Sequence, residues 1–269
     1  MLRDRLSEED SAIIETIKRV AWVTGASQGI GAAVSRRLAR DGWIVAASAR
    51  SADKLHALSQ EAEHLPGSIV VFPLDVTDEP AVERVFADIE ARLGPVQLAI
   101  LNAGTHEPIP ATEFSVAPVR RLIEINLMGA VHCLTPVISR FVARRSGRIA
   151  VVASLAGYRG LPTASAYGAS KAGLINMCES LRPELLDAGV VLSCVTPGFV
   201  CTPLTDRNPF PMPFLIDVDT AADRILRGVA GRQFEITFPR RFSYLMKVLR
   251  LLPYALYFAI VRRVSPRRD

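Results

Sequence analysis

Short apolar runs alternate with longer amphipathic segments along this chain of 269 residues, and no other feature limits its possible folds as much. The runs are rich in Val, Ile and Ala and apolar throughout, as is typical of parallel strands buried on both faces. They lie at residues 20–24, 43–49, 69–74, 98–101, 148–153, 190–195 and 234–238. Helix-length segments separate them at residues 29–41, 54–64, 79–93, 119–145 and 166–188. The pattern predicts a single α/β domain with a doubly wound parallel sheet of about seven strands and helices on both faces.

Composition excludes several other classes of protein. With 49% hydrophobic and 22% charged residues, the chain lacks the bias of collagens, mucins, coiled coils and disordered proteins. The four Cys form no C-x-x-C pair and the four His form no H-x-x-H pair, so we expect no metal site and a reduced, cytoplasmic environment. Residues 1–18 are a polar N-terminal extension without the apolar core of a signal peptide.

A glycine-rich turn joins the first predicted strand to the first predicted helix. It reads Thr24-Gly25-Ala26-Ser27-Gln28-Gly29-Ile30-Gly31. Glycines in such a turn let the backbone approach a pyrophosphate, and the free N–H groups at the start of the helix favour its negative charge. Because the turn lies between a strand and a helix, it predicts a dinucleotide site. The predicted contacts are Gly25, Ser27, Gln28, Gly29, Ile30 and Gly31.

Further motifs follow this turn in order along the chain. They are Asp75-Val76-Thr77, Asn102-Ala103-Gly104, Asn126, Ser154, Tyr167, Lys171, Pro197-Gly198 and Thr202. Together with the T-G-x-x-x-G-I-G turn, they resemble the classical short-chain dehydrogenase/reductase family over residues 19–202. The resemblance implies a Rossmann-type fold, a nicotinamide cofactor and an oxidoreductase activity. It also implies further cofactor contacts from Asp75, Val76, Asn102, Ala103, Gly104, Tyr167, Lys171, Pro197, Gly198 and Thr202.

Tyr167 and Lys171 are four residues apart, so a helix presents both side chains on one face. A free phenol has a pKa of about 10, which is too high for a proton shuttle at neutral pH, and a nearby ammonium lowers that pKa. We therefore predict that Tyr167 is the general acid and base and that Lys171 tunes it. The alternative is an ordinary helix with a core Tyr and a solvated Lys.

The family resemblance implies roles for the other catalytic candidates. Ser154 would hydrogen-bond the substrate carbonyl, Lys171 would also hold the nicotinamide ribose, and Asn126 would anchor a water that links Lys171 to solvent. Two structural alternatives stay open from the residues alone. Ser154 can end a strand, and Asn126 can be a polar residue inside a helix that is satisfied locally.

The end of the second predicted strand bears on the choice of cofactor. An NAD enzyme places an acid there for the ribose hydroxyls, whereas this chain has Ala49 followed by Arg50. The Arg fork matches a 2′-phosphate, so we predict NADP(H), although Gln28 stands where many NADP-using relatives carry a second basic residue. The resemblance also implies that Asp75 contacts the adenine and that Asn102 stabilises the central sheet. Asp75 can alternatively cap the helix predicted at residues 79–93.

Two segments near the C-terminus are expected to surround the substrate. Residues 199–218 hold four prolines among Phe, Met and Leu side chains, which predicts a mobile lid over a lipophilic substrate, with a stiff packed loop as the alternative. Residues 239–269 are apolar and carry eight basic residues and one acid, whereas residues 1–238 carry 24 basic and 26 acidic residues. Because the excess charge is confined to this tail, we expect no nucleic-acid partner.

Pro253 divides the tail into two predicted short helices, a helical C-terminal extension. Its longest uncharged run, residues 251–261, is shorter than the ~20 residues that span a bilayer. Apolar helices with basic margins fit a peripheral membrane contact on the cytosolic face. The alternative is a contact between subunits of a homo-dimer or homo-tetramer.

The leading hypothesis is an NADP(H)-dependent oxidoreductase that interconverts a ketone and a secondary alcohol on a lipophilic small molecule. A first alternative is a soluble 3-oxoacyl-carrier-protein reductase, which needs basic residues near the pocket mouth for an acidic carrier. Within residues 199–218 only Arg207 is basic. A second alternative is a catalytically idle nucleotide-binding sensor or scaffold. That class is expected to lose Ser154, Tyr167 or Lys171, and all three are present.

Overall fold

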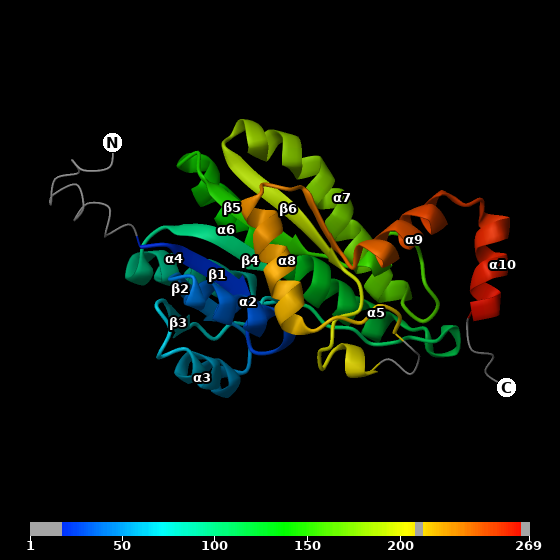
Figure 1. Ribbon diagram of the computed structural model, residues 1–269, viewed down its shortest axis with the longest axis horizontal. Helices are drawn as coiled ribbons and strands as arrows, with labels where there is room; N and C mark the ends of the chain where they lie inside the picture. The colour runs from blue at the N-terminus through cyan, green and yellow to red at the C-terminus, as the bar shows by residue number, and fades with distance from the viewer. Residues whose placement is uncertain (1–17, 208–211, 265–269) are drawn as a thin grey trace, which may run out of the picture.

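The computed structural model describes residues 18–207 and 212–264; most of the predicted N-terminal extension, part of the predicted substrate loop and the last residues of the tail lie outside them. Seven parallel strands form one sheet in the order β3-β2-β1-β4-β5-β6-β7 (Figure 1). The strands are β1 (Val20–Thr24), β2 (Ile44–Ser48), β3 (Ser68–Val71), β4 (Val96–Leu101), β5 (Gly147–Val152), β6 (Val190–Pro197) and β7 (Glu235–Phe238). The predicted doubly wound sheet is confirmed.

Helices cover both faces of the sheet and enclose two hydrophobic cores. One core lies under α2 (Gly29–Arg40), α3 (Ala52–Glu61) and α8 (Val218–Ala230). The other lies under α4 (Glu79–Leu93), α6 (Gly129–Ala143) and α7 (Ser165–Asp187). The strands are apolar on both sides because each side faces one of these cores.

The helix predicted at residues 119–145 is interrupted in the structure. It consists of α5 (Val116–Ile123), a π-helical turn η2 (Glu124–Met128) and α6. The run Val116–Ala143 is long and apolar enough to cross a membrane by length and composition. Its buried side chains, among them Cys133 and Phe141, belong instead to the core between the helices and the sheet. The π-helical turn matters for the site because it carries Asn126.

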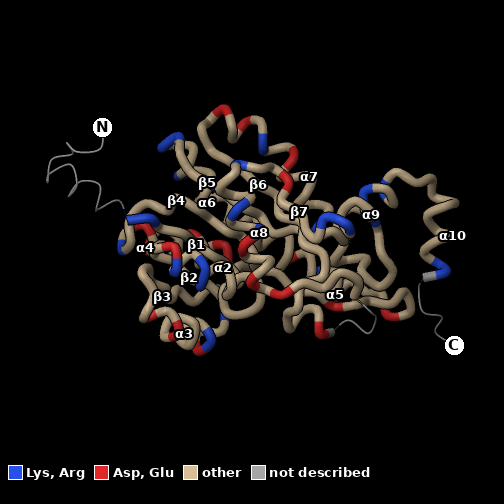
Figure 2. Tube along the Cα trace, in the orientation of Figure 1, with Lys and Arg blue, Asp and Glu red and all other residues tan. Residues whose placement is uncertain are grey.

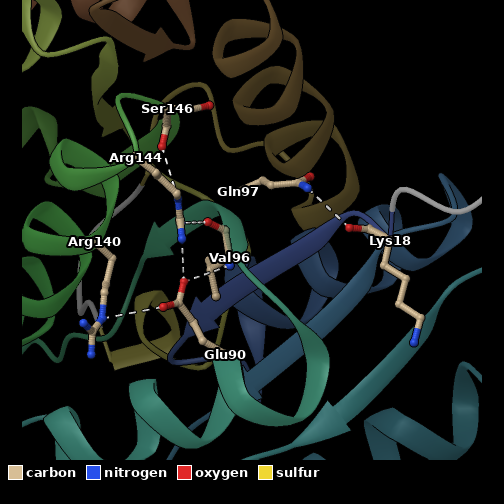
Figure 3. Close-up of polar contacts among 7 residues, drawn as sticks. All are labelled: Lys18, Glu90, Val96, Gln97, Arg140, Arg144 and Ser146. Atoms are coloured by element: carbon tan, nitrogen blue, oxygen red, sulfur yellow. Dashed lines mark hydrogen bonds and ion pairs between the residues drawn. The ribbon is translucent and has the colours of Figure 1, made fainter.

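A polar network fixes the amino-terminal end of β4, at the opposite edge of the sheet from the predicted site. The Glu90 carboxylate accepts hydrogen bonds from Nη1 of Arg144 (2.8 Å) and from the backbone N–H of Val96 (3.1 Å), as Figure 3 shows. Arg140 lies 3.7 Å from the same carboxylate. Only 18% of the Glu90 side chain is exposed, so this ion pair joins α4, β4 and α6 at one point.

The strand order reverses at β1, which pairs with β2 on one side and with β4 on the other. In a doubly wound sheet, the helices on the two sides of such a switch point leave a crevice at the carboxyl ends of the strands. The predicted glycine-rich turn follows β1 and the Asn102-Ala103-Gly104 motif follows β4, so both motifs lie at this crevice.

The chain ends in two helices, α9 (Arg240–Leu251) and α10 (Tyr254–Val264), which lie on either side of Pro253 as predicted. α9 packs against β7 and reaches the carboxyl-end edge of the sheet, and α10 extends beyond the rest of the domain (Figure 1). Three short 3-10 turns complete the described part of the chain: η1 (Ala111–Glu113), η3 (Leu155–Gly157) and η4 (Thr205–Arg207).

Candidate active site

The glycine-rich turn after β1 has a backbone that other residues cannot easily adopt. Gly25 and Gly29 have φ angles of 66° and 57°, in the left-handed region. A Cβ on Gly31 would lie 2.3 Å from the carbonyl oxygen of Gly25, so α2 begins in direct contact with the turn. Nδ2 of Asn102 donates to the carbonyls of Thr24 and Gly25 (both 3.2 Å), which ties the turn to the end of β4. The turn is therefore a rigid backbone cradle at the start of a helix.

Asp75 follows β3, and its side chain does not cap α4. Its Oδ1 accepts hydrogen bonds from the N–H (3.0 Å) and the hydroxyl (2.9 Å) of Thr77. The cap of α4 is Asp78, whose side chain accepts from the N–H of Ala81 (2.9 Å). The cap alternative for Asp75 is wrong, and its half-buried carboxylate lies in the turn between β3 and α4, at the carboxyl-end edge of the sheet.

The structure brings the other predicted cofactor contacts to the same edge of the sheet. Thr202 covers the glycine-rich turn, because a Cβ on Gly29 would lie 3.1 Å from its Cγ2. The hydroxyl of Thr205 donates to the carbonyl of Val200 (2.7 Å) and holds the Thr202 segment in place. The remaining contacts lie in the turns after β1, β3, β4 and β6 or at their borders: Ser27, Ile30, Val76, Ala103, Gly104, Pro197 and Gly198.

Three exposed polar side chains surround the point where β2 ends. Arg50 follows the strand, and Gln28 lies on the neighbouring glycine-rich turn. Nζ of Lys54, in the first turn of α3, donates to Oε1 of Gln28 (3.0 Å). Lys54 was not predicted as a cofactor contact, although the sequence shows a second cation four residues after Arg50. The two cations Arg50 and Lys54 thus lie where the chain turns from β2 into α3, and residue 49 there is Ala instead of an acid.

Ser154, Tyr167 and Lys171 converge at the carboxyl end of β5. Ser154 lies two residues beyond the strand and caps η3, because its hydroxyl accepts from the N–H of Ala156 (3.2 Å). Tyr167 and Lys171 lie on successive turns of the start of α7. The Ser154 hydroxyl also hydrogen-bonds the Tyr167 phenol. The helical spacing predicted from Tyr-x-x-x-Lys thus places both side chains beside Ser154.

Lys171 is buried, with 4% of its surface exposed. Its Nζ donates to the carbonyl of Val152 (2.8 Å) and lies 5.8 Å from the centroid of the Tyr167 ring. A Cβ on Gly104 would lie 3.4 Å from this nitrogen, so the absence of a side chain there leaves room for the ammonium. Burial disfavours the charged form and lowers the pKa of Lys171 to about 8.

The pKa of Tyr167 shifts in the direction opposite to the prediction. Desolvation raises it above the ordinary value, and the hydrogen bond from Ser154 opposes this rise in part. Lys171 does not reverse the shift: its Nζ is hydrogen-bonded to the carbonyl of Val152 and lies 5.8 Å from the centroid of the Tyr167 ring. Tyr167 therefore holds its proton at neutral pH, as a general acid must.

Asn126 is fully buried in the π-helical turn. Its Oδ1 accepts from the N–H of Thr105 (2.7 Å), and its Nδ2 donates to the carbonyl of Thr105 (2.9 Å) and to the hydroxyl of Ser170 (3.2 Å). These partners belong to the loop after β4 and to α7, so the alternative of local satisfaction within its own helix is wrong. Asn126 joins the two segments that carry Gly104 and Lys171.

A pocket opens beside Ser154 and Tyr167, and several of its walls were not predicted. His106 lies in the loop after β4, with its ring 4.6 Å from the Tyr167 ring. Phe242 and Met246 reach the pocket from α9. Apolar side chains make up most of the remaining wall: Leu155, Leu161, Pro197, Phe199 and Leu204. No local sequence signal joins α9 to residues 154–167, because the chain brings them together only through β6 and β7.

The predicted substrate loop forms another side of this pocket. Its two ends are joined by hydrogen bonds from Cys201 N–H to Ile216 O (2.8 Å) and from Ile216 N–H to Phe199 O (3.2 Å). The Phe199 ring stacks on Phe242 of α9, with centroids 5.4 Å apart. Residues 208–211 at its tip lie outside the described residues. The two ends of the loop are thus hydrogen-bonded to each other, and one of them packs against α9.

Within residues 18–207 and 212–264, no three His, Cys, Asp or Glu side chains form a group that could hold a metal ion. The model of the short chain dehydrogenase family matches residues 19–209, which include the glycine-rich turn and all four catalytic candidates. This chain belongs to that family. The prediction made from the motifs is therefore confirmed.

Individual relatives cover between 71% and 91% of the chain. An uncharacterized oxidoreductase of Myxococcus xanthus (strain DK1622) is 38% identical over 91% of this chain and 97% of that protein. A 2-dehydro-3-deoxy-L-rhamnonate dehydrogenase (NAD(+)) of Sphingomonas sp. (strain SKA58) is 38% identical over 71% of this chain and 76% of that protein. An alcohol dehydrogenase of Thermococcus sibiricus, solved with 5-hydroxy-NADP, has a TM-score of 0.75 at 27% identity and covers 82% of this chain and 96% of its own.

The crevice of this family member fits a nicotinamide dinucleotide. The glycines at 25, 29 and 31 leave a cradle that a Cβ would fill, and the N–H groups at the start of α2 face it. When bound, the cofactor supplies or accepts a hydride. The arrangement can hold an oxygen atom of a substrate by hydrogen bonds from Ser154 and Tyr167, and the Tyr167 phenol can transfer a proton to or from that oxygen.

Proposed function

We propose that this oxidoreductase uses NADP(H) and interconverts a ketone and a secondary alcohol on a lipophilic substrate. The proposed substrate class rests on the apolar composition of the pocket wall. Beside the polar pair Ser154 and Tyr167, the wall consists mainly of apolar side chains, including Phe199, Phe242 and Met246. A sugar or a small acid would leave its hydroxyl or carboxyl groups without partners against such a wall, which costs binding free energy.

Substrate class is tested with a panel of ketones of increasing chain length and a matched set of sugars and keto acids, each assayed with NADPH. We expect kcat/KM to rise with chain length, by up to about fourfold for each methylene group that becomes buried. The Met246→Thr variant should lose most of this chain-length dependence while keeping its rate with the shortest ketone. A higher kcat/KM for sugars or keto acids than for long-chain ketones would refute the substrate class.

The choice of NADP(H) is supported by charge at the end of β2. Arg50 and Lys54 lie there, and Ala49 stands where an acid would repel a 2′-phosphate. A charge-assisted contact contributes ~1.5–3 kcal/mol, which corresponds to an affinity ratio of ~10–150. We expect NADPH to bind more tightly than NADH by a factor in this range.

The cofactor preference is measured by titration of each cofactor into the wild type and three variants. Arg50→Ala and Lys54→Ala should weaken NADPH binding and leave NADH binding nearly unchanged. Arg40→Ala removes a matched exposed guanidinium at the end of α2, so it should change neither. Equal affinity for both cofactors in the wild type would exclude a phosphate contact at this corner, and a preference for NADH would reverse the assignment.

One observation favours a second candidate, a reductase of 3-oxoacyl groups on an acidic carrier protein. No basic cluster is evident in residues 199–218, but the structure brings another segment to the pocket. Arg240 and Arg241 begin α9, directly before the pocket residue Phe242. A comparison of one 3-oxoacyl chain as a carrier-protein thioester and as a short thioester distinguishes the candidates. The carrier form must have the higher kcat/KM, and Arg240→Glu with Arg241→Glu must abolish that advantage.

A further inference from the structure

Helix α9 has two apolar faces, and only one of them is buried. Phe242 and Met246 on the inner face line the substrate pocket, and Met246 is 2% exposed. The outer face carries large apolar side chains in contact with solvent: Tyr244, Leu245, Val248 and Leu251. Leu251 is 85% exposed. Since a helix is about 10 Å across, this outer face lies about one helix diameter from the pocket wall.

Helix α10 continues the exposed apolar surface. Its side chains Leu256, Phe258 and Ile260 are exposed, and Tyr257 is its buried anchor. With 11 residues, it is too short to span a bilayer, which takes ~20. We call the exposed apolar side chains of the two helices, namely Tyr244, Leu245, Val248, Leu251, Leu256, Phe258 and Ile260, the docking face.

Arg159 holds the bend between the two helices. Its guanidinium donates to the carbonyls of Arg250 (2.9 Å) and Leu252 (3.3 Å) and lies over the rings of Tyr254 (4.6 Å) and Tyr257 (4.4 Å). The Tyr257 hydroxyl donates to the carbonyl of Gly160. The loop between η3 and α7 therefore fixes α10 relative to α9, and the docking face is pre-formed rather than assembled on binding.

The charge of the two helices is of one sign. Residues 240–264 carry six basic side chains and no acidic one, namely Arg240, Arg241, Lys247, Arg250, Arg262 and Arg263. They lie at the start and along the length of α9 and at the end of α10, as Figure 2 shows, so they flank the docking face. Lys247 is paired with Glu235 of β7. An apolar surface with cationic margins is complementary to acyl chains beneath anionic headgroups.

We propose that α9 and α10 dock the enzyme on an anionic lipid bilayer, with the docking face in the acyl boundary and the pocket next to the lipid surface. A lipophilic ketone or alcohol then passes between bilayer and pocket along α9 without crossing bulk water. The docking rests on the two helices alone, whereas the substrate path rests on the proposed function.

The two other possible occupants fit the surface less well. In a two-fold contact with a second copy, the same basic residues of both copies come together, and like charges repel. An acidic carrier protein pairs with the arginines but leaves most of the apolar docking face in water. An anionic bilayer satisfies both the charge and the apolar area.

The docking is tested by co-sedimentation of the full-length protein with phosphatidylcholine vesicles, with and without phosphatidylserine. We expect binding to the anionic vesicles, and a decrease of about tenfold or more when salt rises from about 0.1 M to about 0.5 M. Leu251→Glu and Phe258→Glu should abolish binding. Leu186→Glu is the matched control, because Leu186 is an exposed apolar residue at the far end of α7, and it should bind as the wild type does.

Three outcomes overturn the docking: no sedimentation of the wild type with anionic vesicles, an equal loss in the Leu186→Glu control, or a dimer in size-exclusion chromatography that Leu251→Glu dissociates. The substrate path has a separate readout. Anionic vesicles should lower the KM of a long-chain ketone for the wild type but not for Leu251→Glu, and should leave a short, water-miscible ketone unaffected. Sedimentation without this KM effect retains the docking and refutes the substrate path.

Discussion

The buried ammonium of Lys171 makes the stability of this protein depend on pH in a predictable direction. Burial lowers the pKa of Lys171 from 10.5 to about 8. Between these values the folded protein binds fewer protons than the unfolded chain, so the free energy of unfolding rises with pH. One pKa unit is worth about 1.36 kcal/mol, so the full interval corresponds to about 3 kcal/mol. We expect wild type to gain about this much relative to Lys171→Met between pH 8 and pH 10.5.

The assay is urea denaturation of both proteins at several pH values across this interval, followed by circular dichroism. Titrations that the two proteins share cancel in the difference between their unfolding free energies. Lys54→Met supplies the matched control, since it removes an exposed ammonium instead of a buried one. If the wild type and Lys171→Met instead follow parallel curves, burial does not lower the pKa of Lys171.

Further variants test individual contacts. Tyr167→Phe should lower kcat by ~10²–10⁴-fold and leave the Kd of the cofactor nearly unchanged, because only the proton donor is lost; a wild-type kcat would exclude Tyr167 as that donor. His106→Ala should raise KM more than it lowers kcat, because the His106 ring lines the pocket and contacts the Tyr167 ring. Asp78→Ala should lower the free energy of unfolding by ~1 kcal/mol through loss of the α4 cap, and a larger loss in Asp75→Ala would contradict the assignment of the cap.

The strands could be predicted from the sequence because burial on both faces leaves a direct signature. The run at residues 20–24 coincides with β1, and the run at residues 43–49 exceeds β2 by one residue at each end. The π-helical turn Glu124–Met128 left no such signature, because apolar side chains continue through it in α5 and α6. Hydrophobic periodicity shows which residues are buried, but it does not show that one turn of a helix contains an additional residue, as a π-helical turn does.

The residues of the site also differ in whether the sequence could predict them. Gly25, Ser154, Tyr167 and Lys171 could be found because the backbone conformation and the chemistry require fixed residue types at fixed spacing. His106 and Met246 could not, because a pocket wall requires only shape and low polarity, and many side chains supply both. The pKa of Tyr167 was also beyond the sequence, since it depends on how deeply the phenol and the ammonium of Lys171 are buried together.

The contact between Gly198 and Phe242 has a consequence for how enzymes built like this one diversify. A Cβ at residue 198 would lie 2.9 Å from the Phe242 ring, so a bare backbone after β6 is what admits α9 to the cavity. The family model ends at residue 209, well before α9. Ser154, Tyr167 and Lys171 lie within the matched stretch, whereas Phe242 and Met246, which also line the pocket, lie beyond it. If the proposed function and docking hold, replacement of the residues after 239 would change both the substrates that fit the pocket and the membrane that the enzyme binds.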